Sequence, residues 1–287
     1  MRRVLAALAA AGALGAAAED ARWYAKIDND VLFHTDRWYS SGVRIARVAA
    51  EAGGASEWGL LHEVYTPEAK RFVPSVTLDR APTARLLASH ARHWSDDAHF
   101  LTLEGDLGVR GAGAQGERVT DAIHRIISAP RVDWSRETRS QIDASLAATD
   151  TRRFGIVDLH YGAVAGTERT FAHAGLQVNA GPVAVPSEAL RYVATPPFAL
   201  AGGAREGWGA FAGASVRGVA RDRLLDRSYD PTLPPPERRR AVARAAVGAA
   251  HAGRWALVSL TVVQESREFT AQRGPQRFGS LVVHIPF

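Results

Sequence analysis

From about residue 20 onward, the sequence consists of short segments in which apolar side chains alternate with small, polar or charged ones. In the segment 208–217, for example, Trp208 and Val216 belong to one alternating set, while Phe211 and Arg217 belong to the other. Similar segments cover 42–50, 98–109, 169–180, 241–251 and 254–268. A period of two over about ten residues, with charges in the inward set, is typical of a transmembrane β-strand. The strands of soluble β-sandwiches alternate too. A barrel is therefore predicted from the whole series of such segments in a chain that is also predicted to be exported.

The N-terminal residues have the layout of a secretory leader. Arg2 and Arg3 precede an uninterrupted apolar run over 4–18, which ends in the small residues Ala16, Ala17 and Ala18. This run is shorter than the roughly 20 residues that a membrane-spanning helix needs. We therefore predict a signal peptide at 1–18 and a mature domain that covers 19–287.

The cysteine count limits how an exported chain of this size can be stabilised. The chain has no cysteine, so no disulfide framework can form. After the leader, no stretch is long enough to be a transmembrane helix. An exported chain can still cross a membrane as a closed barrel, because closure pairs every backbone group that lipid cannot hydrogen-bond.

The last segment, 280–287, supports a barrel. Leu281, Val283, Ile285 and Phe287 share one apolar face, and the sequence stops at the aromatic residue. Outer-membrane barrels commonly end in this way, and the seven Trp and six Tyr residues could form interfacial girdles. We predict an all-β fold, namely a transmembrane antiparallel β-barrel.

Three stretches interrupt the alternating pattern. The proline-containing segments 182–206 and 226–238 are predicted to be long loops. In 117–128, Val119, Ile123, Ile126 and Ile127 fall at helical spacing, which predicts one short amphipathic helix. A local departure from the main pattern often marks a functional site.

The charge balance bears on possible partners. The formal net charge is +5, or +3 without Arg2 and Arg3, and lysine occurs only at Lys26 and Lys70. Because an exported protein rarely meets nucleic acid, anionic lipid phosphate is the better match for this arginine-rich surface, and no nucleic-acid partner is expected.

Three polar clusters could carry chemistry, although each has an ordinary structural interpretation. The first spans 28–42, the second spans 66–71, and the third spans 105–111 and leads into the helix with His124. Neighbouring Asn and Asp residues usually mark a turn. A single His beside Ile residues is usually packed in a core, and Lys70 with Arg71 would normally be a solvated pair.

Together, the clusters resemble one family, the outer-membrane lipid A 3′-O-deacylases (LpxR). The resemblance runs from about residue 24 to 287 and rests on five motifs in the family's order. They are Asn29-Asp30, Tyr39-Ser40-Ser41-Gly42, Tyr65-Thr66-Pro67 with Lys70, the glycine-rich strand end 105–111, and His124-Arg125-Ile126-Ile127 followed by Trp134. The sequence departs from the family pattern at Thr120, Asp121, Ala112 and Thr167.

The resemblance implies about twelve strands, with one short helix near an active site at the outer rim. It implies calcium-assisted deacylation of lipid A, with His124 as general base and Asp30 as a calcium ligand. Asn29 would help shape the oxyanion site, and Ser40 would lie beside it. Lys70 would contact the anionic head group or the developing charge, and Arg71 would be a second substrate-binding residue. Lipid A and the outer membrane would be the partners of a monomeric chain.

Two other functions remain open at this point. The same chemistry could act on a glycerophospholipid, or the barrel could be a non-enzymatic pore or structural protein. A serine-triad hydrolase is less attractive, because the sequence has no Gly-x-Ser-x-Gly motif.

Overall fold

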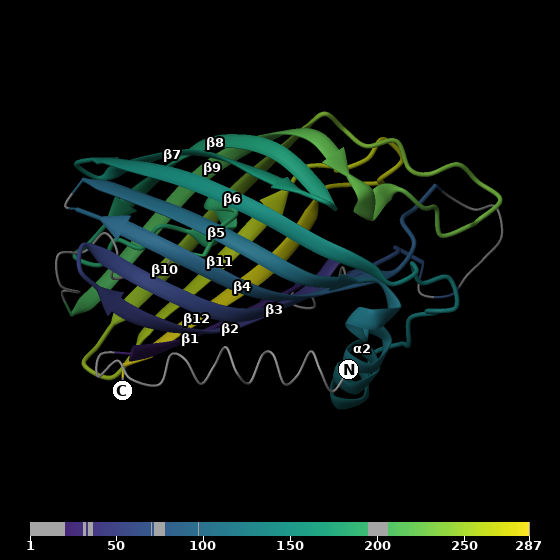
Figure 1. Cartoon of the computed structure of the whole chain (residues 1–287), viewed down its shortest axis with the longest axis horizontal. Coiled ribbons are helices and arrows are strands. Elements are labelled where there is room, and N and C mark those ends of the chain that lie inside the picture. The colour runs from purple at the N-terminus through teal and green to yellow at the C-terminus, as the bar shows by residue number, and fades with distance from the viewer. Residues whose placement is uncertain are drawn as a thin grey trace.

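The protein is a closed antiparallel β-barrel (Figure 1). The computed structural model describes residues 21–30, 33, 37–69, 71, 78–96, 98–194 and 206–286. Within these residues twelve strands follow one another around the wall, and β1 pairs with β12 to close it. The predicted fold class is therefore confirmed. The predicted leader, 1–18, lies outside the described residues and stays a prediction.

The strands and helices occur in the following order along the chain. They are β1 (Ala21–Asn29), β2 (Trp38–Glu51), β3 (Gly54–Thr66), β4 (Thr83–Ser95), β5 (His99–Arg110), η2 (Ala112–Ala114), α2 (Gly116–Ile127), β6 (Gln141–Phe154), β7 (Val157–Gly166), β8 (Arg169–Ala180), α3 (Glu188–Arg191), β9 (Gly207–Asp222), η4 (Arg223–Leu225), β10 (Ala241–Ala252), β11 (Leu257–Glu265) and β12 (Gln276–Pro286).

Burial follows the alternation seen in the sequence. In β9, Phe211 and Arg217 are buried inside the barrel, whereas Trp208 on the opposite set is 68% exposed. The same alternation places Ile285 of β12 on the outside, in agreement with the predicted apolar face. The strand predictions at β2, β5, β8, β9, β10, β11 and β12 and the helix prediction at α2 are confirmed.

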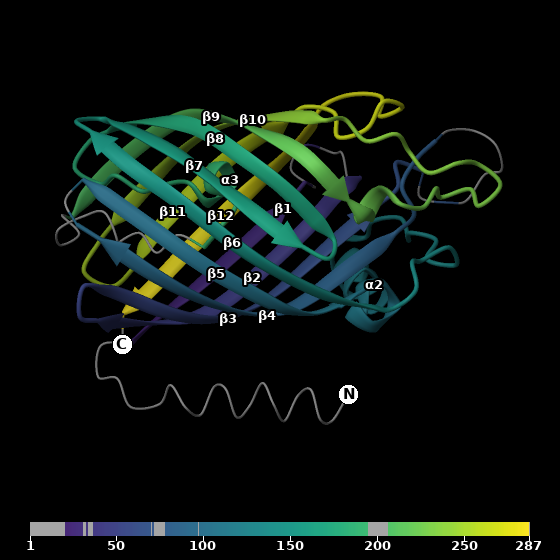
Figure 2. The ribbon, with the colours of Figure 1, turned by 45° about the horizontal axis from the view of Figure 1, so that its top comes forward.

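The two ends of the barrel differ (Figure 2). One end carries the connections 30–37, 67–82, 111–140, 223–240 and 266–275, and we call it the outer rim because the longer loops of such barrels are extracellular. The opposite end, here called the inner end, has tight turns at 52–53 and 155–156 and the connection 181–206. No helix among the described residues is long and apolar enough to cross a membrane.

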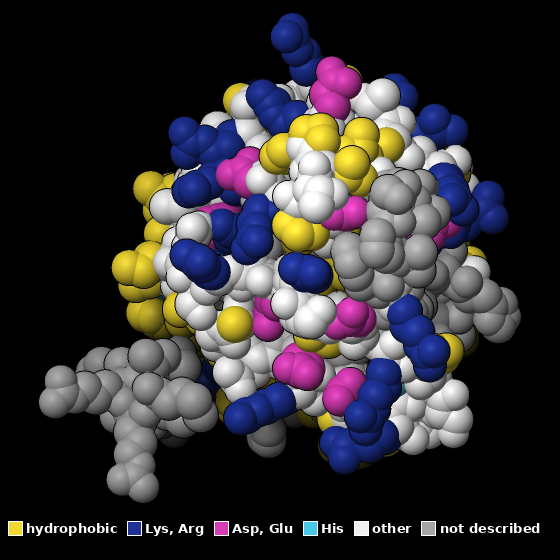
Figure 3. Space-filling model, turned by 90° about the vertical axis from the view of Figure 1, so that its right-hand side faces the viewer, with side chains coloured by type: hydrophobic (Ala, Val, Ile, Leu, Met, Phe, Trp, Pro, Cys, Tyr) yellow, Lys and Arg dark blue, Asp and Glu magenta, His cyan; other side chains and the backbone are white. Residues whose placement is uncertain are grey.

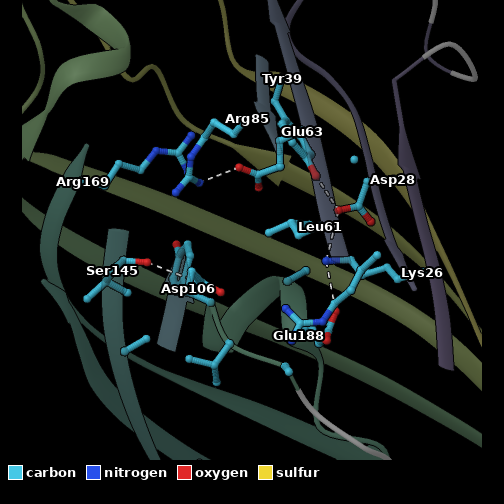
Figure 4. Close-up of a pocket in the computed structure, with 18 of the residues that line it drawn as sticks. Lys26, Asp28, Tyr39, Leu61, Glu63, Arg85, Asp106, Ser145, Arg169 and Glu188 are labelled. Carbon is cyan, nitrogen blue, oxygen red and sulfur yellow. Dashed lines mark hydrogen bonds and ion pairs between the residues drawn. The ribbon is translucent and has the colours of Figure 1, made fainter. Parts of the chain in front are cut away.

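The barrel interior is filled by ion pairs and by a short helix. Arg44 contacts Glu57 and Glu104 at 2.6 Å each. In the predicted loop 182–206, the described residues 182–194 contain the short helix α3, which the sequence did not predict, and Glu188 of α3 pairs with Lys26 in the interior at 3.1 Å (Figure 4). A cavity of ≈ 160 Å³ lies among these side chains, and half of its lining residues are charged. Such an interior does not favour a pore.

Candidate functional site

The α2 segment, defined here as residues 111–140, packs on the outside of the wall. Alternation along β3 and β4 places Val64 and Ala84 on the outward set, because Glu63 and Arg85 line the interior. Both outward residues belong to a buried cluster with Ala114, Val132 and Trp134. Helix α2 therefore lies beside β3 and β4 at the outer rim (Figures 1 and 2).

Two glycines allow this close packing. Gly111 adopts φ +81°, and a Cβ there would lie 2.4 Å from the carbonyl oxygen of Thr138. A Cβ at Gly116 would lie 2.6 Å from both Ala84 and Trp134. The two glycines and Trp134 therefore act together to hold the start of α2 against the wall.

His124 lies in the last turn of α2 and is only 5% exposed. The helix ends at Ile127 and is capped by Ser128, which has φ +55°. The chain then turns so that the Pro130 carbonyl oxygen is 2.6 Å from His124 Nδ1. A carbonyl oxygen can only accept a hydrogen bond, so Nδ1 must carry the proton. Nε2 of the neutral ring is therefore the nitrogen that can accept a proton.

Asn29 shares a cross-strand row with the wall residues beneath α2. Asn29 pairs with Ser41, Ser41 with Val64, and Val64 with Ala84. Asn29 is on the outward set of β1, because Lys26 and Asp28 line the interior. With strands spaced about 4.8 Å apart, Asn29 and Val64 are roughly 10 Å apart. Asn29 and the α2 segment thus lie on the same outer face of the wall, near the same rim.

Ser40 and Asp30 lie next to this row. Ser40 falls at a β-bulge between Tyr39 and Ser41, and its Oγ is 2.5 Å from Thr66 Oγ1. The Asp30 amide donates to the Ser40 carbonyl at 3.3 Å. The Asp30 carboxylate is almost fully buried and accepts from the Arg37 amide at 2.7 Å. The structure therefore brings together Asn29, Asp30 and Ser40 at one point of the rim.

The Tyr-Ser-x-Gly motif has a clear packing reason. Tyr39 points into the interior and donates to Asp28 Oδ2 at 2.8 Å (Figure 4). Its phenol oxygen would lie 2.0 Å from a Cβ at Gly42, so any side chain there would displace the Tyr39 hydroxyl. The motif fixes the bulge and, through it, the position of Ser40.

The predicted head-group ligands are less well defined. Lys70 lies outside the described residues, and Arg71 is exposed. Many Arg side chains gather on the outer-rim end of the molecule (Figure 3). In the α2 segment, the exposed arginines are Arg118, Arg125, Arg131, Arg136 and Arg139.

The oxygen-rich surroundings of Asp30 fit calcium, which prefers hard oxygen ligands. The Ser40 carbonyl lies at the Asp30 amide, one residue's length from the carboxylate, and the Ser40 hydroxyl contacts that of Thr66. Among the described residues, no three His, Cys, Asp or Glu side chains are grouped as metal ligands. A calcium ion here would therefore depend on carbonyl, hydroxyl and water oxygens as well as on one carboxylate.

Sequence reasoning missed three features of this region. The Pro130 carbonyl sets the His124 tautomer but leaves no side-chain signature. Thr66 was recognised only as part of a motif, although its hydroxyl contacts Ser40. Glu137 was not singled out, yet burial, and to a smaller degree Glu117, raises its pKa to about 7.

Comparison with known proteins decides the family. A family model described as "Outer membrane protein LpxR" matches residues 3–287. The chain belongs to the LpxR family. It is therefore a lipid A deacylase, an ester hydrolase, and it resides in the outer membrane.

The fold is similar to that of a solved LpxR structure. LpxR from Salmonella typhimurium is 19% identical, covers 93% of this chain and 100% of its own, and superposes with a TM-score of 0.75. The β-domain of the Bordetella autotransporter BrkA is 12% identical, with 93% and 99% of the two chains covered and a TM-score of 0.47. No curated protein sequence matches the chain significantly.

Proposed function

We propose that the protein hydrolyses the 3′-linked acyl ester of lipid A in the outer leaflet, with His124 as the general base. The main support is the Nδ1–Pro130 hydrogen bond, which leaves Nε2 as the basic nitrogen of a buried ring. The α2 segment carries this ring on the outer face of the wall. A lipid ester can reach that face from the membrane without entering the filled interior.

In the proposed reaction, His124 Nε2 accepts a proton from a water molecule as the water oxygen attacks the ester carbonyl carbon. The bond to the sugar oxygen then breaks, and the imidazolium returns the proton to that leaving oxygen. The Nδ1–Pro130 bond holds the ring orientation throughout both transfers.

Residues of the neighbouring strand ends would stabilise the charge that develops on the carbonyl oxygen. Asn29 is on the outward set, so its side-chain amide could donate to that oxygen. The Ser40 hydroxyl, which is oriented by Thr66, would lie beside it. A calcium ion held in part by Asp30 would polarise the ester carbonyl. Lys70 and Arg71 would bind the phosphates of the head group.

The decisive experiment is a deacylation assay on detergent-solubilised protein and purified lipid A. The assay is run with calcium and with a chelator, and products are identified by mass spectrometry. His124→Ala should reduce turnover by about 10²- to 10⁴-fold, the usual contribution of a general base. His251→Ala is the matched control, because His251 packs on Trp208 near the inner end and should leave turnover unchanged.

The products separate the remaining alternatives. Release of a 3-hydroxy or acyloxy fatty acid from the 3′ position supports the proposal. Turnover of glycerophospholipid in preference to lipid A would contradict the substrate, and full activity of His124→Ala would contradict the base.

A further inference from the structure

A second concave surface lies on the outer wall, away from His124. It is a groove of ≈ 730 Å³ across β4 to β7, which is within the range of about 300–1,000 Å³ found for ligand sites. Its outward-facing lining includes Ala88, Gly105, Ala144 and Ala165, with Leu107 and Leu146 beside them. These two leucines are 62% and 72% exposed, so they rise above the small residues.

The groove follows one continuous cross-strand row of the sheet. Trp58 pairs with His90, and His90 pairs with Gly105. Gly105 pairs with Leu146, and Leu146 pairs with Ala165. Four strand spacings of about 4.8 Å make this row roughly 19 Å long, compared with about 15 Å for the hydrocarbon of one leaflet.

The same row continues to the outer rim. Ala165 pairs with Thr170, and Thr170 pairs with Arg221. Trp58 lies in the middle of β3, whereas Ala165 and Arg221 are each the next-to-last residue of their strands at the rim. The row therefore climbs from within the hydrocarbon to the level of the head groups.

The two ends of the groove differ in chemistry. The deep end is bounded by Trp58, which stacks on His90 with ring centroids 4.2 Å apart. The rim end is bounded by Thr167 and Arg221, both of which are exposed. Within the described part of the chain, Arg221 has no carboxylate at ion-pair distance. A guanidinium of this kind suits a phosphate, which it can bind through two hydrogen bonds.

We propose that this groove binds an accessory lipid A molecule, with a phosphate at Arg221 and one acyl chain along the row toward Trp58. The occupant is assigned from the polarity of the groove, which is cationic at the rim and apolar within the membrane. Lipid A is chosen because the rim end faces the outer leaflet. The groove begins beyond Leu86 and Val109, which the α2 segment covers, so the groove and the α2 segment occupy different parts of the wall. The proposal does not depend on the catalytic mechanism.

The absence of cysteine allows a direct test. Ala165→Cys places one thiol in the groove, and Ala212→Cys places one on the outward face of β9 outside it; both positions are exposed. Both are made with His124→Ala, so that lipid A is not consumed. The rate of maleimide labelling is measured in detergent with and without lipid A. At a lipid concentration tenfold above Kd, labelling of the Ala165→Cys variant should slow about 10-fold, and that of the Ala212→Cys variant should not change.

A second pair of measurements identifies the ligand. Adding Arg221→Gln to the Ala165→Cys variant should remove the protection, and phosphatidylethanolamine should not protect. Equal protection at positions 165 and 212, or protection that survives Arg221→Gln, would overturn the groove site. Equal protection by phosphatidylethanolamine would overturn the choice of lipid A. Lack of deacylase activity in the wild-type chain would contradict only the proposed function, because labelling is read without turnover.

Discussion

Truncation of Trp134 tests whether the wall holds α2 in place. Trp134 is 6% exposed and packs against Val64, Ala84, Ala114 and Val132. Truncating a buried Trp to Ala typically costs about 3–5 kcal/mol. Because 1.4 kcal/mol is about tenfold in an equilibrium constant, Trp134→Ala should shift docking of the α2 segment by roughly 10²- to 10⁴-fold. The barrel itself should remain, since its twelve described strands pair without this segment.

The assay combines limited trypsin digestion with deacylation. Undocking should expose the peptide bonds after Arg125 and Arg131 to cleavage and should lower deacylation in parallel. Trp255→Ala is the control. Trp255 is 71% exposed in the connection between β10 and β11 at the inner end, so its truncation should change neither readout. A Trp134→Ala protein that resists trypsin and keeps wild-type turnover would refute the argument that packing on the wall positions His124.

Three other predictions concern the same region. Asp30→Asn should raise the calcium concentration needed for half-maximal deacylation; an unchanged calcium titration would exclude Asp30 as a ligand. Ser40→Ala and Thr66→Val should each lower turnover, and the free-energy loss of the double variant should be smaller than the sum of the two single losses, because the two hydroxyls lie 2.5 Å apart and act as one unit; additive losses would mean independent roles. The pKa of Glu137 is raised to about 7 when the α2 segment is docked, so docking is most stable below about pH 4.5 and weakens as the pH rises through 7. Trypsin resistance should therefore fall over this pH window in the wild type but not in Glu137→Gln. Parallel pH profiles of the two proteins would contradict this prediction.

The strands that could be located from the sequence are those in which the inward and outward side chains differ clearly in polarity or size. In β9, small or apolar outward residues alternate with inward residues up to Arg217, and the segment was found. In β3, Leu60 and Leu61 are adjacent and His62 faces outward beneath Ala114, so the alternation is blurred. Near the rim, at His62 and Val64, the outer face of β3 is covered by protein rather than lipid, and apolarity alone does not mark it.

The site was only partly predictable for a similar reason. Asn29, Asp30 and Ser40 are close in sequence and meet across two neighbouring strand ends, which a motif can suggest. The contact between His124 and the Pro130 carbonyl depends on the left-handed turn at Ser128. Backbone acceptors carry no residue signature, so this contact could not be predicted. The position of α3 inside the barrel depends on ion pairs such as Lys26–Glu188, whose partners are far apart along the chain.

The placement of the α2 segment on the outer face has a kinetic consequence. A lipid reaches this face by lateral diffusion within one leaflet, and the released fatty acid stays in the same leaflet. The relevant substrate concentration is therefore a surface density, set by how many lipid A molecules occupy each unit area. Dilution with inert detergent at a fixed bulk concentration of lipid A should slow the reaction, because it lowers the surface density of lipid A around the barrel.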